Sequence, residues 1–307
     1  MADITATAVK ELREQSGAGM MDCKKALIET DGDMEQAIDW LRKKGLAAAA
    51  KKSGRVAAEG LVAVLTAQKI GIVAEVNTET DFVARNPDFQ SFVQKIADTA
   101  LSQGGSFEKT VEASFANGKS VSESVTEMVS SIGENVTFRR SNGCSVKEGI
   151  VASYVHNASA PNMGKIGVIV GLESTGKMEI LEDFGKKLAM HIAAAKPGWI
   201  SSEDVGEKQV NREREILAGQ ARESGKAEEI VQKMVVGRMR KYFEEVCLLE
   251  QTFVIDGESK VSKAIELAAK EAGASIKITD FVRFQLGDGI EKQNSDFAAE
   301  VAATADR

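Results

Sequence analysis

Apolar residues in the first 55 positions recur every three or four residues, the spacing of one face of an α-helix. A first run follows Asp3, a residue type that caps helix starts, and stops at Gly17 and Gly19. A second run is "MMDCKKALIET" (20–30). A third, "MEQAIDWLRKK" (34–44), follows a capping-box pattern and is expected to end at Gly45. The pattern predicts three short helices, followed by a Lys- and Ala-rich linker, "GLAAAAKKSGR" (45–55).

The middle of the chain contains an internal repeat. The segment "EGLVAVLTAQKIGIVAEVN…FVQKIADTA" (59–100) resembles "EGIVASYVHNASAPNMGKIGVIVGLE…FGKKLAMHIAAA" (148–195). Each copy has two apolar strand-like runs and then a helical run. Strand, strand and helix used twice predict two related α+β subdomains.

The two copies differ in length at one place. The first copy is longer between Gly71 and Phe92 than the second is between Gly167 and Phe184, and the extra residues fall on "TETDFVARNPDF" (78–89). Within this stretch, Asp81 and Phe82 suit either a helix cap with a core anchor or a device directed at another molecule. On the residues alone, a helix cap with a core anchor is the commoner role of such a pair. The second copy does without this stretch, which weakens that interpretation without reversing it.

The last third begins with charged helical sequence. Two runs, "VNREREILAGQARES" (210–224) and "EEIVQKMVVGRMRKYF" (228–243), flank Gly225-Lys226 and predict an antiparallel helical hairpin at about 201–242. It suits a self-contained arm as well as a docking or dimerising arm. Strands are predicted at "EVCLLEQTFVI" (245–255) and "SIKITDFVRFQLG" (275–287), with a helix between them and a last helix at "NSDFAAEVAATA" (294–305).

Composition narrows the functional classes. The net charge is −7, and there are only two Trp and two Tyr, which argues against a nucleic-acid-binding protein. No apolar run approaches the roughly 18 residues of a membrane span, and the charged start does not resemble a secretory signal. Three well-separated cysteines favour free thiols in a reducing cytoplasm. A cytoplasmic globular protein is expected.

Motifs for catalysis are missing or incomplete. "GLESTGKM" (171–178) matches Gly-x-x-x-x-Gly-Lys, but Met178 stands where a Ser or Thr should hold Mg²⁺. A turn between strand and helix explains it better. His191 lies in an apolar helical run and is expected to be a satisfied buried imidazole, whereas His156 follows a strand without a nucleophile motif. We expect no catalytic residue, no metal site, no cofactor and no direct nucleotide binding.

Two stretches carry a resemblance to a known family. "LREQSGAGMMDCKKAL" (12–27) and "EVNTETDFVARN" (75–86) resemble the two signature regions of bacterial elongation factor Ts. This family comprises the guanine-nucleotide exchange factors of elongation factor Tu. The resemblance implies an α+β fold with a ubiquitin-associated-like three-helix module, a duplicated core, an inserted coiled-coil hairpin and a C-terminal helix. The implied domains are 1–55, 56–141, 142–284 with the hairpin inserted, and 285–307.

The resemblance also implies a mechanism without bond-making chemistry. Thr80, Asp81, Phe82 and Val83 would press on the GTPase domain of elongation factor Tu beside its Mg²⁺, with Phe82 as a wedge. GDP would then leave and GTP enter. The positions implied for partner contact, on the GTPase domain and on a second domain, are Arg13, Met20, Met21, Lys24, Ile132, Gly133, His156, Asp296 and Phe297. From the residues alone, Met20 and Met21 are better explained as core residues of the helical module.

Two other functions stay open at this point. A non-exchange adaptor would use the helical module and the hairpin to bring partners together, and the hairpin would also suit a homodimer. It would bind elongation factor Tu without affecting GDP release and leaves "TETDFVARN" unexplained. A weaker alternative is an enzyme that binds a nucleotide at Gly171–Lys177.

Overall fold

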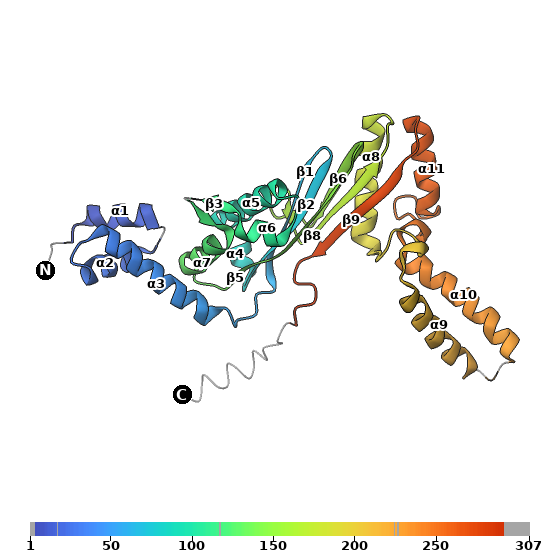
Figure 1. Ribbon diagram of the computed structural model, residues 1–307, viewed down its shortest axis with the longest axis horizontal. Coiled ribbons are helices and arrows are strands. Elements are labelled where there is room, and N and C mark those ends of the chain that lie inside the picture. Colours follow the sequence, from blue (N-terminus) through green and yellow to red (C-terminus); the bar gives the residue numbers. More distant parts are fainter. Residues whose placement is uncertain (1–3, 17, 117, 224, 226, 292–307) are drawn as a thin grey trace. The chain divides into compact units, whose positions relative to one another are not determined.

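The computed structural model describes residues 4–16, 18–116, 118–223, 225 and 227–291. The chain forms two compact units, and Figure 1 shows the helices and strands that they contain. Unit 1 comprises Met1–Val62, Ala74–Ser141 and Gln285–Arg307, and unit 2 comprises Ala63–Val73 and Asn142–Phe284. The class is α+β with antiparallel sheets, as the repeat predicted. The helix expected at 294–305, together with Asp296 and Phe297, lies outside the described residues.

The three predicted N-terminal helices are α1 (Ala6–Ser16), α2 (Met20–Glu29) and α3 (Met34–Lys52). Their shared core contains Leu12, Leu27 and Leu41, all buried. The Asp33 side chain caps α3 by accepting a hydrogen bond from the Gln36 amide at 2.9 Å. Asp3 lies outside the described residues, and the Thr5 Oγ1 atom accepts from the amide of α1's third residue at 3.2 Å.

The predicted end of the third helix at Gly45 is wrong. Helix α3 continues through Gly45 and includes most of the segment expected to be a linker. A helical glycine costs about 1 kcal/mol relative to alanine, but the run Ala47–Ala50 that follows consists of the strongest helix-forming residue. The Ala- and Lys-rich stretch is therefore an extension of the helix.

The internal repeat is present as two copies of a strand–strand–helix motif. The first is β1 (Glu59–Ala67), β2 (Ile70–Thr78) and α5 (Pro87–Ser102), and the second is β6 (Gly149–His156), β8 (Ile166–Glu173) and α8 (Met178–Ala195). Gly60 and Gly149 start the two copies with φ of 126° and 113°. A Cβ atom would lie 2.2 Å from the Val76 carbonyl oxygen at Gly60 and 2.1 Å from the Leu172 carbonyl oxygen at Gly149. Both copies thus require a glycine where the strands approach closely.

The strands of the described residues form two larger sheets and one small one. The first sheet has the order β5-β2-β1-β7, with β5 (Val136–Ser145) and β7 (Met163–Gly164) at its edges. The second has the order β6-β8-β9, with β9 at Lys277–Gln285. Strands β3 (Ser114–Ala116) and β4 (Lys119–Ser120) pair alone, beside α6 (Phe107–Glu112) and α7 (Val121–Ile132).

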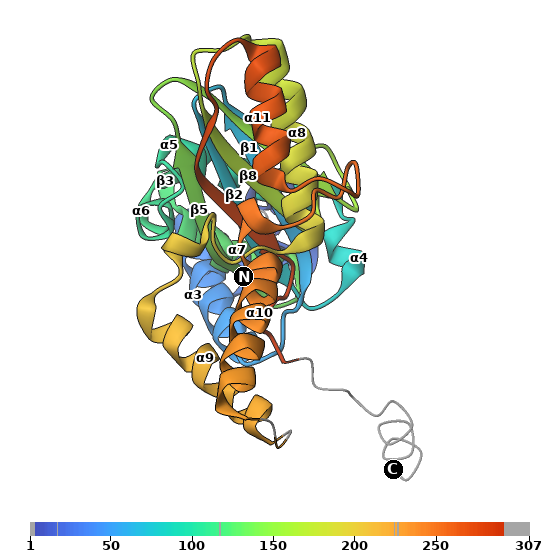
Figure 2. The ribbon, with the colours of Figure 1, turned by 90° about the vertical axis from the view of Figure 1, so that its right-hand side faces the viewer.

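The core of unit 2 lies between the β6-β8-β9 sheet and two helices, α8 and α11 (Val261–Ala272), which cover the same face (Figure 2). The strand predicted at 245–255 is wrong. Helix α10 (Glu228–Val246) includes the first two of these residues, and a 3₁₀ turn, η2 (Leu248–Glu250), follows. The Leu248 amide donates to the Trp199 carbonyl at 2.8 Å, and Leu248 and Phe253 are buried in this core. Backbone carbonyls of a neighbouring loop therefore accept the hydrogen bonds that these amides would otherwise have donated to a neighbouring strand.

Unit 2 also contains the predicted helical hairpin. It consists of α9 (Glu207–Arg222) and α10 (Glu228–Val246), preceded by a 3₁₀ turn, η1 (Ser202–Asp204). Its own small core contains Ala221, Val231, Val235 and Met239. This core packs the two helices against each other, while Ile216 and Ile230 stay exposed.

The close approach at the repeat glycines is testable. Gly149→Ala should lower the free energy of unfolding by about 2–4 kcal/mol, because the new methyl group meets a backbone oxygen in a conformation that favours glycine. Gly219→Ala is the matched control. It lies in α9, where an added Cβ atom would meet no other atom within 4 Å, and should be neutral or stabilising by up to about 1 kcal/mol. Urea unfolding of both variants measures the difference, and equal stability of Gly149→Ala and the wild type would contradict the close approach.

Candidate functional site

The insertion that distinguishes the first repeat forms a short, exposed helix. We call residues 78–86 the motif loop. It begins where the buried strand β2 ends and contains α4 (Asp81–Ala84), with Thr80 as the N-cap residue. The side chain of Phe82 is 78% exposed, while Ala84 is buried. The interpretation of Phe82 as a core anchor is therefore wrong.

A carboxylate from a distant part of the chain holds the base of this loop. Glu134 accepts hydrogen bonds from the Thr78 hydroxyl at 2.8 Å, the Thr80 amide at 3.0 Å and the Thr80 hydroxyl at 2.7 Å. Burial alone would raise the pKa of Glu134, but the hydrogen bonds from Thr80 and Thr78 outweigh burial and hold this pKa below its ordinary value of 4.5. We call these three hydrogen bonds the Glu134 clamp.

In a second set of contacts the carboxylate belongs to the motif loop and the donor to the segment that follows α7. Glu79 Oε1 accepts from the Asn135 amide at 2.5 Å, and Asn135 Nδ2 donates to the Arg55 carbonyl at 2.7 Å. The Arg55 guanidinium lies 3.4 Å from Glu79 Oε1. Residues 78–80 and 134–135 thus hold each other through both side chains and backbone, which fixes the direction in which the motif loop leaves the sheet.

Asp81 is paired at the surface. Its Oδ2 accepts from the Arg85 Nη2 atom at 2.6 Å, one turn further along; the Arg85 side chain is largely exposed and that of Asp81 is partly exposed. An exposed pair of this kind contributes only about 0–1 kcal/mol. The Asp81 carboxylate can therefore leave Arg85 and bind another partner at a small cost in free energy. Asp81 is not the cap residue, because Thr80 occupies that position.

Ile132 and Gly133 lie directly before the Glu134 clamp. Helix α7 ends with Ile132, which is half-buried, and Gly133 is exposed with φ of 86°, the left-handed conformation of a C-cap. The chain therefore connects these two residues to Thr80–Val83 through Glu134. Nothing in the local sequence pattern indicated Glu134 itself, because its partners are 54 and 56 residues away.

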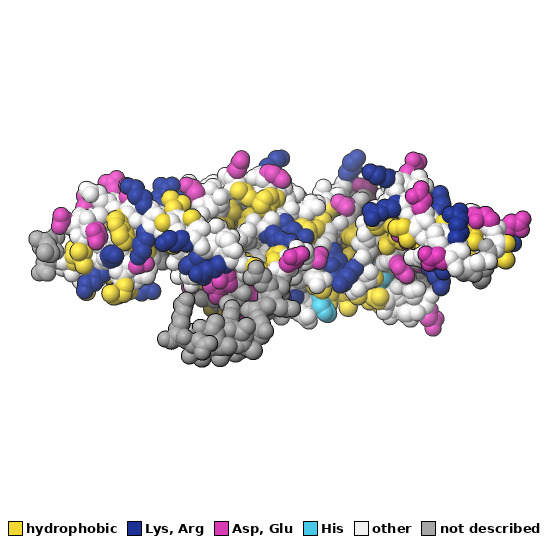
Figure 3. Space-filling view, turned by 90° about the horizontal axis from the view of Figure 1, so that it is seen from below, with side chains coloured by type: hydrophobic (Ala, Val, Ile, Leu, Met, Phe, Trp, Pro, Cys, Tyr) yellow, Lys and Arg dark blue, Asp and Glu magenta, His cyan; other side chains and the backbone are white. Residues whose placement is uncertain are grey.

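A further group lies on the N-terminal helices. Arg13 and Lys24 are exposed, Met20 is 50% exposed and Met21 is 76% exposed. The core interpretation of the two methionines is therefore wrong. Ile28 is exposed as well, two helical turns beyond Met21 on α2, and its i+7 spacing was the signal that would have added it. Figure 3 shows apolar side chains at the surface of this region among charged ones.

His156 belongs to unit 2, whereas the motif loop belongs to unit 1. It is exposed at the end of β6, where its Nδ1 lies 3.0 Å from the Tyr154 hydroxyl. The imidazole is therefore engaged with a neighbour on its own strand and open to solvent.

The two sequence features that resembled catalytic chemistry are structural. In the turn at 171–178, the Gly176 amide donates to Ser174 Oγ and the Lys177 amide to the Ala272 carbonyl, both at 3.0 Å, so these amides are engaged within the protein. His191 is buried with Nε2 3.0 Å from Gln251 Oε1, and burial lowers its pKa. Within the described part of the chain, no cluster of His, Cys, Asp or Glu could hold a metal ion, and no helix is long and apolar enough to cross a membrane.

The Glu134 clamp should depend on pH. Its lowered pKa means that the carboxylate contributes stability above pH 4.5 and loses this contribution as the pH falls through the folded-state pKa. The wild type should therefore be more stable than Glu134→Gln from pH 7 to about pH 5, by about 1–3 kcal/mol, and the difference should shrink below that. Urea unfolding across this range measures it, with Glu35→Gln on the exposed surface of α3 as the control. A difference that grows on acidification would contradict the clamp.

Comparison with known proteins gives a consistent result over the whole chain. The family model described as "Elongation factor TS" matches residues 79–288. The chain is 61% identical over 306 residues to elongation factor Ts of Rhodospirillum centenum, covering 99% of this chain and 100% of that protein. It is 57% identical over 307 residues to that of Paramagnetospirillum magneticum, covering 99% and 98%, and 56% identical over 306 residues to that of Agrobacterium fabrum, covering 99% of each. The chain therefore belongs to the elongation factor Ts family.

Proposed function

We propose that this protein binds elongation factor Tu carrying GDP and uses the motif loop to weaken the Mg²⁺ and phosphate site, so that GDP leaves and GTP binds. Its family implies a translation elongation factor that acts in protein biosynthesis as a nucleotide exchange factor. The observation that carries the proposal is Phe82, a large apolar side chain that is 78% exposed on a loop held rigidly at its base. A cytoplasmic location follows from the proposed function.

The motif loop has suitable physical properties for this task. Full burial of a Phe side chain stabilises a contact by about 1.5–3 kcal/mol, and this free energy is available only when a partner covers Phe82. Mg²⁺ requires nearly ideal octahedral geometry and is sensitive to small shifts of its ligands. Asp81, once released from Arg85, would offer a carboxylate to groups around the metal.

Exchange of this kind is a coupling of two binding equilibria and needs no catalytic acid or base. If the factor weakens nucleotide binding to elongation factor Tu by some ratio, nucleotide weakens binding of the factor by the same ratio. The factor therefore binds the nucleotide-free partner best and is released when GTP or GDP binds.

The remaining contact residues would supply affinity. Arg13, Met20, Met21 and Lys24 would dock on the GTPase domain, where the flexible methionine side chains suit an adaptable surface. Ile132 and Gly133 would lie beside the wedge. In the proposed assignment His156 holds a second domain of elongation factor Tu, together with Asp296 and Phe297.

The adaptor is the second candidate. The hairpin favours it, because Ile216, Ile230 and Val236 are exposed apolar residues that a docking partner or a second copy of the chain would cover. It leaves the exposure of Phe82 without a purpose. The two candidates differ in one measurable respect, since an adaptor would bind elongation factor Tu without changing GDP release.

Phe82→Ala should lower the maximal rate of GDP release at least about tenfold while preserving most of the docking affinity, because 1.4 kcal/mol corresponds to a factor of ten. The measurement is release of a fluorescent GDP analogue from elongation factor Tu with Mg²⁺ present, over a range of factor concentrations. Asp81→Ala/Phe82→Ala tests the whole wedge, and Leu267→Ala, which removes another exposed apolar side chain, is the control. Absence of acceleration by the wild type would leave only the adaptor, and acceleration retained by the double variant would move the mechanism away from the motif loop.

The docking surface should show the complementary behaviour. Met20→Ala/Met21→Ala should raise the factor concentration that gives half-maximal GDP release by about tenfold and leave the maximal rate unchanged, since these side chains would contribute to binding alone. Val254→Ala/Ile255→Ala, a pair of exposed apolar neighbours in unit 2, is the matched control. A fall in maximal rate equal to that of Phe82→Ala would argue against a division between docking and wedge.

A further inference from the structure

Helix α3 joins two parts of unit 1 that were expected to be separated by a Lys- and Ala-rich linker. Its first half contributes Ala37 and Leu41 to the core of the N-terminal helices. Its second half packs along α7, the helix that ends beside the motif loop. A helix of 19 residues spans about 28 Å at a rise of about 1.5 Å per residue. One continuous element therefore connects the surface of Met20 and Met21 with the neighbourhood of Phe82.

The packing of α3 on α7 is close because Gly45 has no side chain. A Cβ atom at position 45 would lie 2.8 Å from Ser130 Oγ and 3.5 Å from Ser130 Cβ. The glycine that was expected to end the helix thus permits the approach of the two helices. This gives Gly45 a packing role that offsets its low helix propensity.

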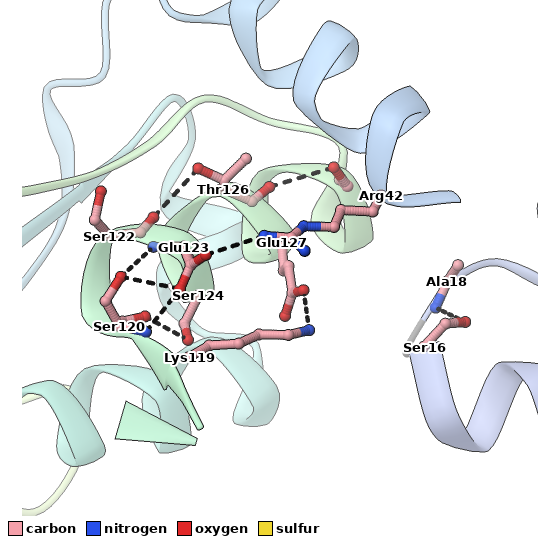
Figure 4. A network of polar contacts seen from close by, with 11 residues as sticks. Ser16, Ala18, Arg42, Lys119, Ser120, Ser122, Glu123, Ser124, Thr126 and Glu127 are labelled. Atoms are coloured by element: carbon pink, nitrogen blue, oxygen red, sulfur yellow. Dashed lines mark hydrogen bonds and ion pairs between the residues drawn. The ribbon is translucent and has the colours of Figure 1, made fainter. Parts of the chain in front are cut away.

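An ion pair lies next to this contact. Arg42 Nη2 lies 3.1 Å from Glu123 Oε1, and Figure 4 shows the two side chains reaching across the space between α3 and α7. Glu123 is itself held in place, because its Oε2 accepts from the Ser120 amide at 3.0 Å in a capping box. The pair is about half exposed, so it contributes little to stability, but it is a direct side-chain link from α3 to α7 beside the Gly45 contact.

Both helices lead into the base of the motif loop. Beyond α3, the Arg55 carbonyl accepts from Asn135 Nδ2 at 2.7 Å. Beyond α7, Glu134 forms the clamp on Thr78 and Thr80. The contact at Gly45 and Ser130 therefore closes a ring of described contacts that runs from α3 to the motif loop and back.

We infer that α3 is a rigid strut, and that Arg42 and Gly45 are positioning residues which hold the docking surface of Met20 and Met21 at a fixed separation from Phe82. This inference rests on the proposed function. When two binding groups belong to one rigid body, attachment of the first makes attachment of the second effectively intramolecular. It also avoids ordering a tether during binding. The strut therefore affects the factor concentration that gives half-maximal GDP release. The maximal rate of GDP release depends on Phe82 alone.

A reversible crosslink tests the strut directly. The 3.5 Å separation of the two Cβ positions suits a disulfide. In Gly45→Cys/Ser130→Cys, oxidised glutathione would take two electrons and two protons from the thiols to form the bond, and dithiothreitol would reverse it. The native cysteines Cys23, Cys144 and Cys247 are buried and should not compete. We expect the crosslink to form, and the oxidised protein to release GDP from elongation factor Tu with a half-maximal concentration and a maximal rate within about twofold of the reduced protein.

A variant that weakens the contact between α3 and α7 is the complementary test. Arg42→Glu places like charges opposite Glu123 and should raise the half-maximal concentration about three- to tenfold without changing the maximal rate. Lys43→Glu makes the same charge change at the adjacent exposed residue and should change neither value by more than about twofold. The inference is overturned if the crosslink fails to form, if oxidation slows GDP release, or if Arg42→Glu behaves like Lys43→Glu. Absence of exchange by the wild type would instead overturn the proposed function, while crosslink formation would still test the helix contact.

Discussion

The three hydrogen bonds accepted by Glu134 are the constraint on which the motif loop depends. They hold Thr78 and Thr80 at the end of a buried strand, directly before a Phe side chain that faces solvent. An apolar side chain on a loosely held loop would gain free energy by folding back onto the protein surface. Because the base of the motif loop is fixed, Phe82 cannot fold back onto the protein surface and stays available to another molecule.

A second carboxylate organises the same strand further from its end. Glu75 is fully buried in β2 and is contacted by Arg139 at 3.0 Å, Arg140 at 2.6 Å and the Gly287 amide at 2.8 Å. A buried charge is costly unless it is paired and hydrogen-bonded, and this one is both. Through Glu75, strand β2 is connected to β5 and to the backbone at Gly287. The same strand leads into the motif loop.

The duplicated core explains how such a loop was accommodated. Both copies provide the same strands, the same covering helix and the same glycine at the close strand approach. The second copy passes from strand to helix through a turn whose amides bond within the protein. The first copy inserts α4 at this junction and retains its scaffold. A stable framework is therefore present whether or not the junction carries an exposed segment, which leaves the inserted residues free to serve recognition.

Local patterns in the sequence determined the α+β class, the repeated strands and helices, the hairpin, and the motifs that mark the family, because helix and strand periodicity extends over only a few residues. The tertiary structure decided the rest of the site. It placed Glu134 against residues 54 and 56 positions away, left Met20, Met21 and Phe82 exposed, and carried α3 through Gly45 onto α7. It also turned the apolar stretch after α10 into a 3₁₀ turn rather than a strand. Each of these outcomes depends on which distant surface covers a residue, and spacing along the chain holds no information about that.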